Sequence, residues 1–248
     1  MVARTDNVSD PQLAAALSLM RRGQAFWARK LNEVRDADFD APSRLPGWSR
    51  RHLIAHVGFN ARAVARLVEW ASTGVETPMY SSPEQRSEEI EFGATLPTEA
   101  LRNLCAHAAI HLNVSWRDLP EEAWTHEVRT AQGRIVPASE TVWIRTREVW
   151  IHAVDLNNGA RVADFPPELI DALLDDIVRV WRRKRSPLEE NITLQATDRA
   201  RAVSIRDDDE GLVVRGTAVD LVGWGIGRSM RGVVRADGSP APRAPEWL

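Results

Sequence analysis

A glutamate and a histidine four residues apart have the clearest capacity for chemistry in this sequence. In a helix, Glu148 and His152 would lie one turn apart on the same face. Ile144 and Leu156 continue the row, which predicts that this face turns toward the protein interior. An ionised carboxylate there is costly unless a cation meets it, and a metal ion would supply that cation. A buried glutamate–histidine hydrogen bond without a metal, or a glutamate on the surface, explains the spacing about equally well.

Another helix would have to supply a further ligand. His52 and His56 lie four residues apart in a helix expected over residues 49–73, and both are candidates. His107 and His111 repeat this spacing in a later helix and are weaker candidates. Two nitrogen ligands and one oxygen ligand, with one position left open, are typical of a catalytic rather than a structural metal. Such an ion can activate water for hydrolysis or bind a thiolate, and both reactions stay open.

Tyr80 and Arg86 stand out in residues 76–96, which we expect to be largely irregular with a short helix over 83–90. Loops of this length in compact domains are often functional. A guanidinium can hold a carboxylate with two N–H groups, so Arg86 is a candidate anion-binding residue. The usual alternative for an arginine in a loop is a solvated charge.

The composition restricts the class of protein. The 248 residues suffice for one large or two small domains, and a net charge of −3 with interspersed charges indicates neither a nucleic-acid-binding surface nor a basic membrane patch. The single cysteine, Cys105, excludes a disulfide framework within one chain and is expected in the core. We find no signal peptide and no membrane-spanning run, so we expect a cytoplasmic protein. Its charge balance permits a monomer or a dimer.

The elements that would position these residues are mainly helices. Four amphipathic helices are predicted over residues 11–36, 49–73, 98–118 and 139–156, which argues for a helical bundle. Residues 121–138 are expected to connect the last two helices through a turn or a short extended pair.

The pattern changes after about residue 163. We predict a helix over 168–184, strands over 191–197, 201–206 and 211–216 with a hairpin turn at 207–210, a helix over 218–228, and an irregular tail. The expected fold class is therefore α+β. A four-helix bundle domain carrying the metal site would span residues 1–162, and a smaller α+β domain with a short antiparallel sheet would span residues 163–248.

Several segments also resemble known proteins. Gly47-Trp48-Ser49 followed by His52-Leu53-Ile54-Ala55-His56-Val57 is similar to the second helix of the DinB-like metalloenzyme superfamily. The segments Glu76-Thr77-Pro78-Met79-Tyr80, Thr130-Ala131-Gln132-Gly133-Arg134, Pro137-Ala138-Ser139-Glu140-Thr141 and Arg147-Glu148-Val149-Trp150-Ile151-His152-Ala153-Val154-Asp155-Leu156 more closely resemble the mycothiol-dependent maleylpyruvate isomerase family. The resemblance covers most of residues 1–160. The second domain resembles that family's sterol-carrier-like C-terminal domain more weakly.

The resemblance implies a zinc ion held by His56, Glu148 and His152, which selects His56 over His52. Many members of the superfamily use three histidines, so the glutamate departs from the broader pattern in a way that the isomerase family shares. Zinc and mycothiol are the implied cofactors. Nickel, cobalt and iron would also suit a His, Glu and His ligand set.

The implied reaction is the cis–trans isomerisation of 3-maleylpyruvate to 3-fumarylpyruvate in gentisate-type aromatic degradation. Mycothiol thiolate would add reversibly to the double bond, which can then rotate. The resemblance implies that Arg86 acts in catalysis, and it places Arg228 where the family has an arginine near the active site. The expected partners are therefore two small molecules, maleylpyruvate and mycothiol, with no nucleic acid or membrane.

Three other functions stay open. A zinc-dependent mycothiol S-transferase would use the same ligands but leave the thiol on its product. A metal-dependent hydrolase would need no thiol. A helical binding module with a vestigial metal site would keep its function after the substitution Glu148→Ala, whereas an enzyme of this type would lose both its metal and its activity.

Overall fold

The chain forms two compact units, Met1–Ala160 and Arg161–Leu248. The structure is a computed structural model that describes residues 5–184, 191–205 and 211–247. Within this described part, no helix is both long and apolar enough to cross a membrane.

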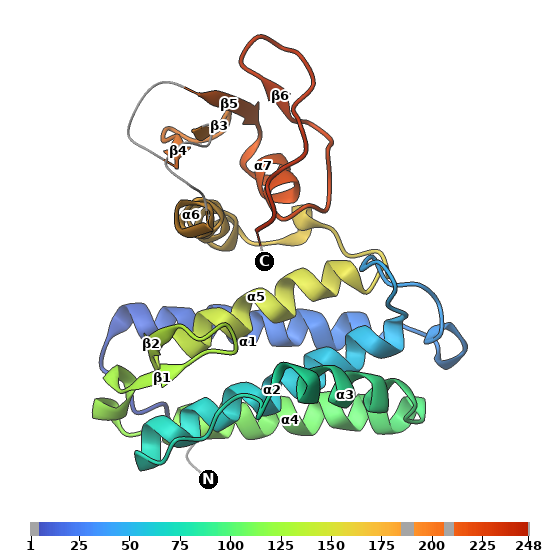
Figure 1. Ribbon diagram of the computed structural model, residues 1–248, viewed down its shortest axis with the longest axis vertical. Helices are drawn as coiled ribbons and strands as arrows, with labels where there is room; N and C mark the ends of the chain where they lie inside the picture. The colour runs from blue at the N-terminus through green and yellow to red at the C-terminus, as the bar shows by residue number, and fades with distance from the viewer. Residues whose placement is uncertain (1–4, 185–190, 206–210, 248) are drawn as a thin grey trace. The chain divides into compact units, whose positions relative to one another are not determined.

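The first unit is built around four long helices (Figure 1), as the hydrophobic periodicity predicts. They are α1 (Pro11–Asn32), α2 (Arg50–Thr73), α4 (Thr98–Asp118) and α5 (Glu140–Asp155). Helix α1 packs mainly against α5, and α2 packs against both α4 and α5. The predicted bundle and the α+β fold class are confirmed.

Local signals explain several of the helix ends. The side chain of Asp10 accepts a hydrogen bond from the backbone N–H of Gln12, and Pro11 occupies the first helical position of α1. Gly74 ends α2 with a φ of 74°, which a residue without Cβ adopts at little cost. Ser49 precedes α2 as predicted, but its hydroxyl makes no capping bond there.

The segment between α2 and α4 is more ordered than predicted. Helix α3 runs from Pro83 to Ala94, so the short helix that we considered over residues 83–90 is present and extends four residues further. The sequence marks the start of this helix. The hydroxyl of Ser82 caps it by accepting from the N–H of Gln85, and a proline follows Ser82 directly.

The connection between α4 and α5 contains the short extended pair that we considered. Strands β1 (Glu127–Arg129) and β2 (Ile135–Pro137) pair antiparallel, and Gly133 lies in their turn with a φ of 77°. The indole N–H of Trp116 on α4 donates to the hydroxyl of Thr141 on α5 at 3.0 Å, inside the core. The hairpin therefore lies next to a firm contact between the two helices that it connects.

In its described residues, the second unit contains two α-helices and a four-stranded sheet. The helices are α6 (Pro167–Lys184) and α7 (Ala218–Gly225), and the strands are β3 (Ile192–Ala196), β4 (Val203–Ser204), β5 (Leu212–Gly216) and β6 (Val234–Arg235). Trp181 and Trp224 meet edge to face at 5.7 Å, where α6 packs against α7.

The sheet topology differs from the prediction. The strand order is β4-β3-β5-β6, with β3 parallel to β5 and the two outer pairings antiparallel. The predicted hairpin between β4 and β5 was wrong, because both strands pair with β3 and lie on opposite sides of it. Its expected turn, residues 207–210, lies outside the described residues. Strand β6 forms within the tail that we expected to be irregular, and α7 ends three residues earlier than the expected end at residue 228.

Candidate metal centre

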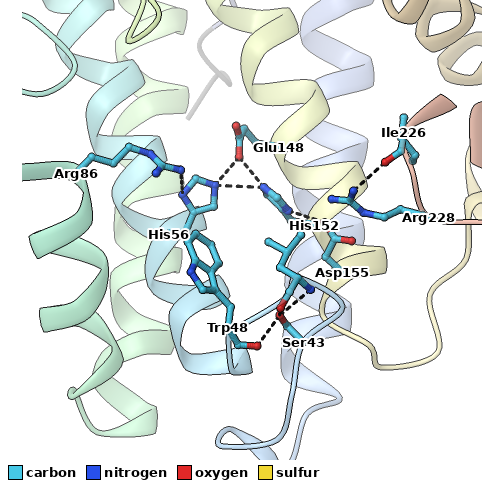
Figure 2. Close-up of polar contacts among 10 residues, drawn as sticks. Ser43, Trp48, His56, Arg86, Glu148, His152, Asp155, Ile226 and Arg228 are labelled. Atoms are coloured by element: carbon cyan, nitrogen blue, oxygen red, sulfur yellow. Dashed lines mark hydrogen bonds and ion pairs between the residues drawn. The ribbon is translucent and has the colours of Figure 1, made fainter. Parts of the chain in front are cut away.

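Three side chains from α2 and α5 converge on one point (Figure 2). Nε2 of His56 lies 3.1 Å from Oε2 of Glu148 and 3.2 Å from Nε2 of His152. Nε2 of His152 lies 3.1 Å from the same glutamate oxygen. Across residues 5–184, 191–205 and 211–247, these three side chains form the only group of histidine, cysteine and acidic residues arranged to share a metal ion.

The periodicity of α5 explains how two of the three side chains reach this point. Glu148 and His152 lie one turn apart on α5, and the flanking Ile144 and Leu156 are buried. The row therefore faces inward, as predicted. His56 lies in the fully buried stretch of α2 and is 5 % exposed. Glu148 keeps 23 % of its side chain exposed, so it is the more open of the two.

Asp155 fixes the orientation of the His152 ring. Its carboxylate is fully buried and lies 2.9 Å from Nδ1 of His152, one turn further along α5. A carboxylate accepts, so this contact places the proton of a neutral His152 on Nδ1 and leaves the Nε2 lone pair directed at Glu148 and His56. This is the tautomer that a metal ligand needs.

The charges within the group are strongly coupled. Burial works to raise the pKa of Glu148, but His56 and His152 hold it well below its usual value. Burial also works against a charged His152, yet Asp155 and Glu148 raise its pKa to about 9. Burial lowers the pKa of His56, although Glu148 opposes the shift. The metal-free site therefore carries its proton on His152, opposite two carboxylates.

Arg86 reaches the same group from α3. Its Nη2 lies 3.4 Å from Nδ1 of His56, on the side of the ring away from Glu148 (Figure 2). Trp48 lies on another side of the ring, with the ring centroids 5.4 Å apart. Tyr80 lies close enough to Arg86 and Glu148 to feel their charges, although burial is the main reason that its pKa rises to about 12.

The loop before α2 is fastened to the end of α5. The backbone N–H of Arg44 donates to the carbonyl of Asp155 at 2.8 Å, and Nε of Arg50 donates to the carbonyl of Leu156 at 2.9 Å. Nη2 of Arg50 also donates to the carbonyl of Asn157 at 2.6 Å. These bonds hold the start of α2 against the end of α5, where Asp155 contacts His152.

The other candidate histidines of the first unit do not join the group. The ring of His52 lies 2.7 Å from the hydroxyl of Ser49 through Nδ1, and its Nε2 faces Glu91 at 3.5 Å. His107 and His111 are exposed on α4. Arg228 belongs to the second unit, where its Nη1 donates to the carbonyl of Ile226 at 2.8 Å. The catalytic role of Arg228 stays a prediction.

Sequence reasoning missed several residues that shape this site. Asp155 carried a readable signal, because a carboxylate three residues after a candidate ligand lies on nearly the same face of a helix. Trp48 and Arg50 carried none, since their roles depend on how a loop folds back on the end of α5. Arg145 resembled one more charge on an amphipathic helix, yet its side chain is 1 % exposed.

The chain is similar to known proteins over most of its length. Residues 20–157 match the family model of the mycothiol maleylpyruvate isomerase N-terminal domain. A solved structure of the mycothiol-dependent maleylpyruvate isomerase is 44 % identical, with a TM-score of 0.89 over 95 % of this chain and 97 % of that chain. A histidine-to-alanine mutant of that enzyme is 43 % identical, with the same TM-score and coverage. A search among curated proteins found no match.

Proposed function

Because this chain belongs to the mycothiol maleylpyruvate isomerase family, we propose that it converts 3-maleylpyruvate to 3-fumarylpyruvate with mycothiol as the thiol cofactor. The observation that carries the proposal is the convergence of His56, Glu148 and His152 beside Arg86 in a chain this similar to the solved isomerase. The reaction would serve gentisate-type aromatic degradation in the cytoplasm. We retain residues 163–248 as a proposed sterol-carrier-like domain.

The ligand atoms fit a zinc ion. Ligands about 2.0–2.1 Å from a tetrahedral zinc lie roughly 3.3 Å from one another. The nitrogen and oxygen atoms of His56, Glu148 and His152 are separated by 3.1 to 3.2 Å, close to that spacing. Zinc bound by these three side chains would keep one open position, where it would hold the mycothiol sulfur as a thiolate near neutral pH.

The thiol has to come from outside the chain. Cys105 is the sole cysteine, it is 3 % exposed, and its Sγ–H faces the carbonyl of Ile54 at 3.3 Å. Burial raises the pKa of this thiol to about 12, so almost none of it is ionised at neutral pH. Cys105 is therefore a core residue, and a low-molecular-weight thiol must supply the nucleophile.

Reversible addition of a thiolate explains how a double bond can isomerise at ordinary temperature. Mycothiol would supply a sulfur nucleophile that adds to one alkene carbon while the π electrons move to the ketone oxygen. The remaining carbon–carbon single bond could then rotate. Return of the electrons would expel the thiolate and restore the alkene in its trans form. The protein supplies position and charge for this sequence of steps.

Arg86 is suited to hold a carboxylate of the substrate. A guanidinium only donates, so its contact with Nδ1 of His56 needs the proton of that ring on Nε2. A His56 that binds a metal through Nε2 carries its proton on Nδ1 instead, and Arg86 then loses its acceptor. The guanidinium is released for an incoming carboxylate, which it can grip with two parallel N–H groups.

Turnover with purified protein tests the proposal. Zinc-loaded protein should convert maleylpyruvate to fumarylpyruvate only when mycothiol is present, and Glu148→Ala should lose both zinc and activity. His107→Ala is the control, because this exposed histidine lies outside the group. Turnover without any thiol would overturn the proposal. A product whose mass includes mycothiol would show an S-transferase instead.

A further inference from the structure

Arg145 carries a buried positive charge that the proposed chemistry does not use. Arg145 lies on α5 in the first unit and is 1 % exposed. Nη1 donates to the carbonyl of Val57 at 2.8 Å and to Oδ1 of Asn60 at 2.9 Å, and Nη2 donates to Oε1 of Gln24 at 3.1 Å. All three acceptors are neutral. Within the described parts of the chain, no carboxylate forms an ion pair with Arg145.

A buried charge without an ionic partner is an expensive way to fill space. An apolar side chain of similar volume at this position would avoid the loss of hydration that a guanidinium suffers. Burial lowers the pKa of Arg145 to about 10, and the charge of Glu148 is the largest effect that opposes this shift, so the guanidinium stays charged at neutral pH. Packing alone therefore does not explain why this core position holds an arginine.

The hydrogen bonds of Arg145 join the helices that bring the ligands together. Arg145 lies three residues before Glu148 on α5, and Val57 directly follows His56 on α2. Through Nη1, Arg145 therefore connects the backbone beside His56 to the turn of α5 that precedes Glu148. The bond to Gln24 adds α1 to the same cluster.

We propose that Arg145 is a positioning residue of the metal centre, whose guanidinium holds α5 in register with α2 so that His56 meets Glu148 and His152. This inference rests on the metal centre proposed above. This clamp, which consists of the guanidinium and its three acceptors, would fix the geometry of the site before any metal binds.

Binding of Co²⁺ tests the inference, because its visible absorption reports ligand geometry as well as affinity. Arg145→Met keeps the chain length but removes the charge and every hydrogen bond. It should lower Co²⁺ affinity by about tenfold or more, as loss of a residue that orients ligands typically does, and change the absorption bands. A loss of less than about threefold with unchanged bands would overturn the inference.

Arg102, which also pairs with Asp36 at 2.9 Å, provides a control in the same unit. It also joins two helical segments through backbone carbonyls, donating to those of Leu31 and Val34 at 2.8 and 2.6 Å, but it lies outside the ligand group. Arg102→Met should lower the melting temperature and leave Co²⁺ affinity within about twofold of the unmodified protein. An equal loss of affinity in Arg102→Met would show general destabilisation and overturn the inference.

Two further measurements keep the test decisive. If Arg145→Met does not fold, Asn60→Ala removes one acceptor of the clamp and should weaken Co²⁺ binding at least threefold, roughly the loss of part of an outer-shell contact. Unchanged binding in Asn60→Ala would then overturn the inference. Co²⁺ binding by the unmodified protein, and its loss in His56→Ala, tests the metal centre separately. If the unmodified protein does not bind Co²⁺, or if His56→Ala binds it equally well, the proposed metal centre itself is overturned.

Discussion

At the scale of single residues, the proton on His152 determines whether the metal-free site can bind an ion. His152 lies between the carboxylates of Asp155 and Glu148, which raise its pKa to about 9 despite burial. A metal can bind Nε2 only after that proton leaves. The acidic partners that orient the ring therefore also make metal binding compete with protons throughout the neutral pH range.

Metal affinity should consequently rise with pH. Below pH 9, binding displaces one proton from His152, so the affinity should increase by about tenfold per pH unit and level off above pH 9. Competition titrations against a chelator between pH 6 and 10 measure this slope. Asp155→Asn removes one of the charges that raise the pKa and should move the plateau to lower pH. A slope of zero between pH 6 and 8 would contradict the prediction.

Substrate binding should depend on Arg86 without involving the metal. Charge-assisted hydrogen bonds are worth about 1.5–3 kcal/mol, so Arg86→Met should lower kcat/KM for maleylpyruvate by about ten- to a hundredfold at unchanged zinc content. Arg62→Met, an exposed arginine on α2, is the control. Steady-state kinetics and metal analysis check both variants. Loss of zinc in Arg86→Met would assign the residue to the metal centre instead.

At the scale of secondary-structure elements, the close approach of α1 to α5 fixes the position of α5. At Gly23, helix α1 comes so near to α5 that an added Cβ would lie 2.4 Å from Nε1 of Trp150 and 2.8 Å from Cγ2 of Val149. These two residues directly follow Glu148. The ring of Trp150 is itself held, since it stacks on Phe26 with centroids 5.0 Å apart. A contact this close leaves α5 little room to move.

A single methyl group should therefore disturb the bundle. Gly23→Ala improves helix propensity by about 1 kcal/mol, but overpacking typically costs about 1–3 kcal/mol, and the rigid indole makes the upper part of that range more relevant. We expect a net destabilisation of about 1–2 kcal/mol in urea unfolding. Trp150→Phe in the same chain should recover part of it. Additive effects in the double mutant would show that the two residues do not meet.

Metal binding should stabilise the chain at the scale of the whole molecule. An ion that binds only the folded state at a thousand times its Kd adds about 4 kcal/mol. For a chain of this size, chelation should lower the melting temperature by roughly 8–16 °C. Scanning calorimetry with and without chelator measures the shift. Glu148→Ala should melt at the same temperature in both conditions, and an equal shift in that variant would place the metal elsewhere.

The local sequence determined those parts of the molecule that depend on neighbours a few residues apart. The period of the apolar residues predicted the four helices of the bundle, and the Glu148–His152 spacing predicted an inward pair, because one turn of a helix fixes which side chains share a face. The helix over Pro83–Ala94, which we considered over residues 83–90, likewise has its cap and its proline in the sequence.

Only the tertiary structure decided which distant groups meet. Residue types left His52 and His56 equivalent, and the packing of α2 against α5 brings His56 alone to Glu148 and His152. The parallel pairing of β3 with β5 and the burial of Arg145 likewise depend on contacts between segments far apart in the chain. Helical periodicity sets the direction of a side chain within its own helix, whereas its partner on another helix is set by how the whole core packs.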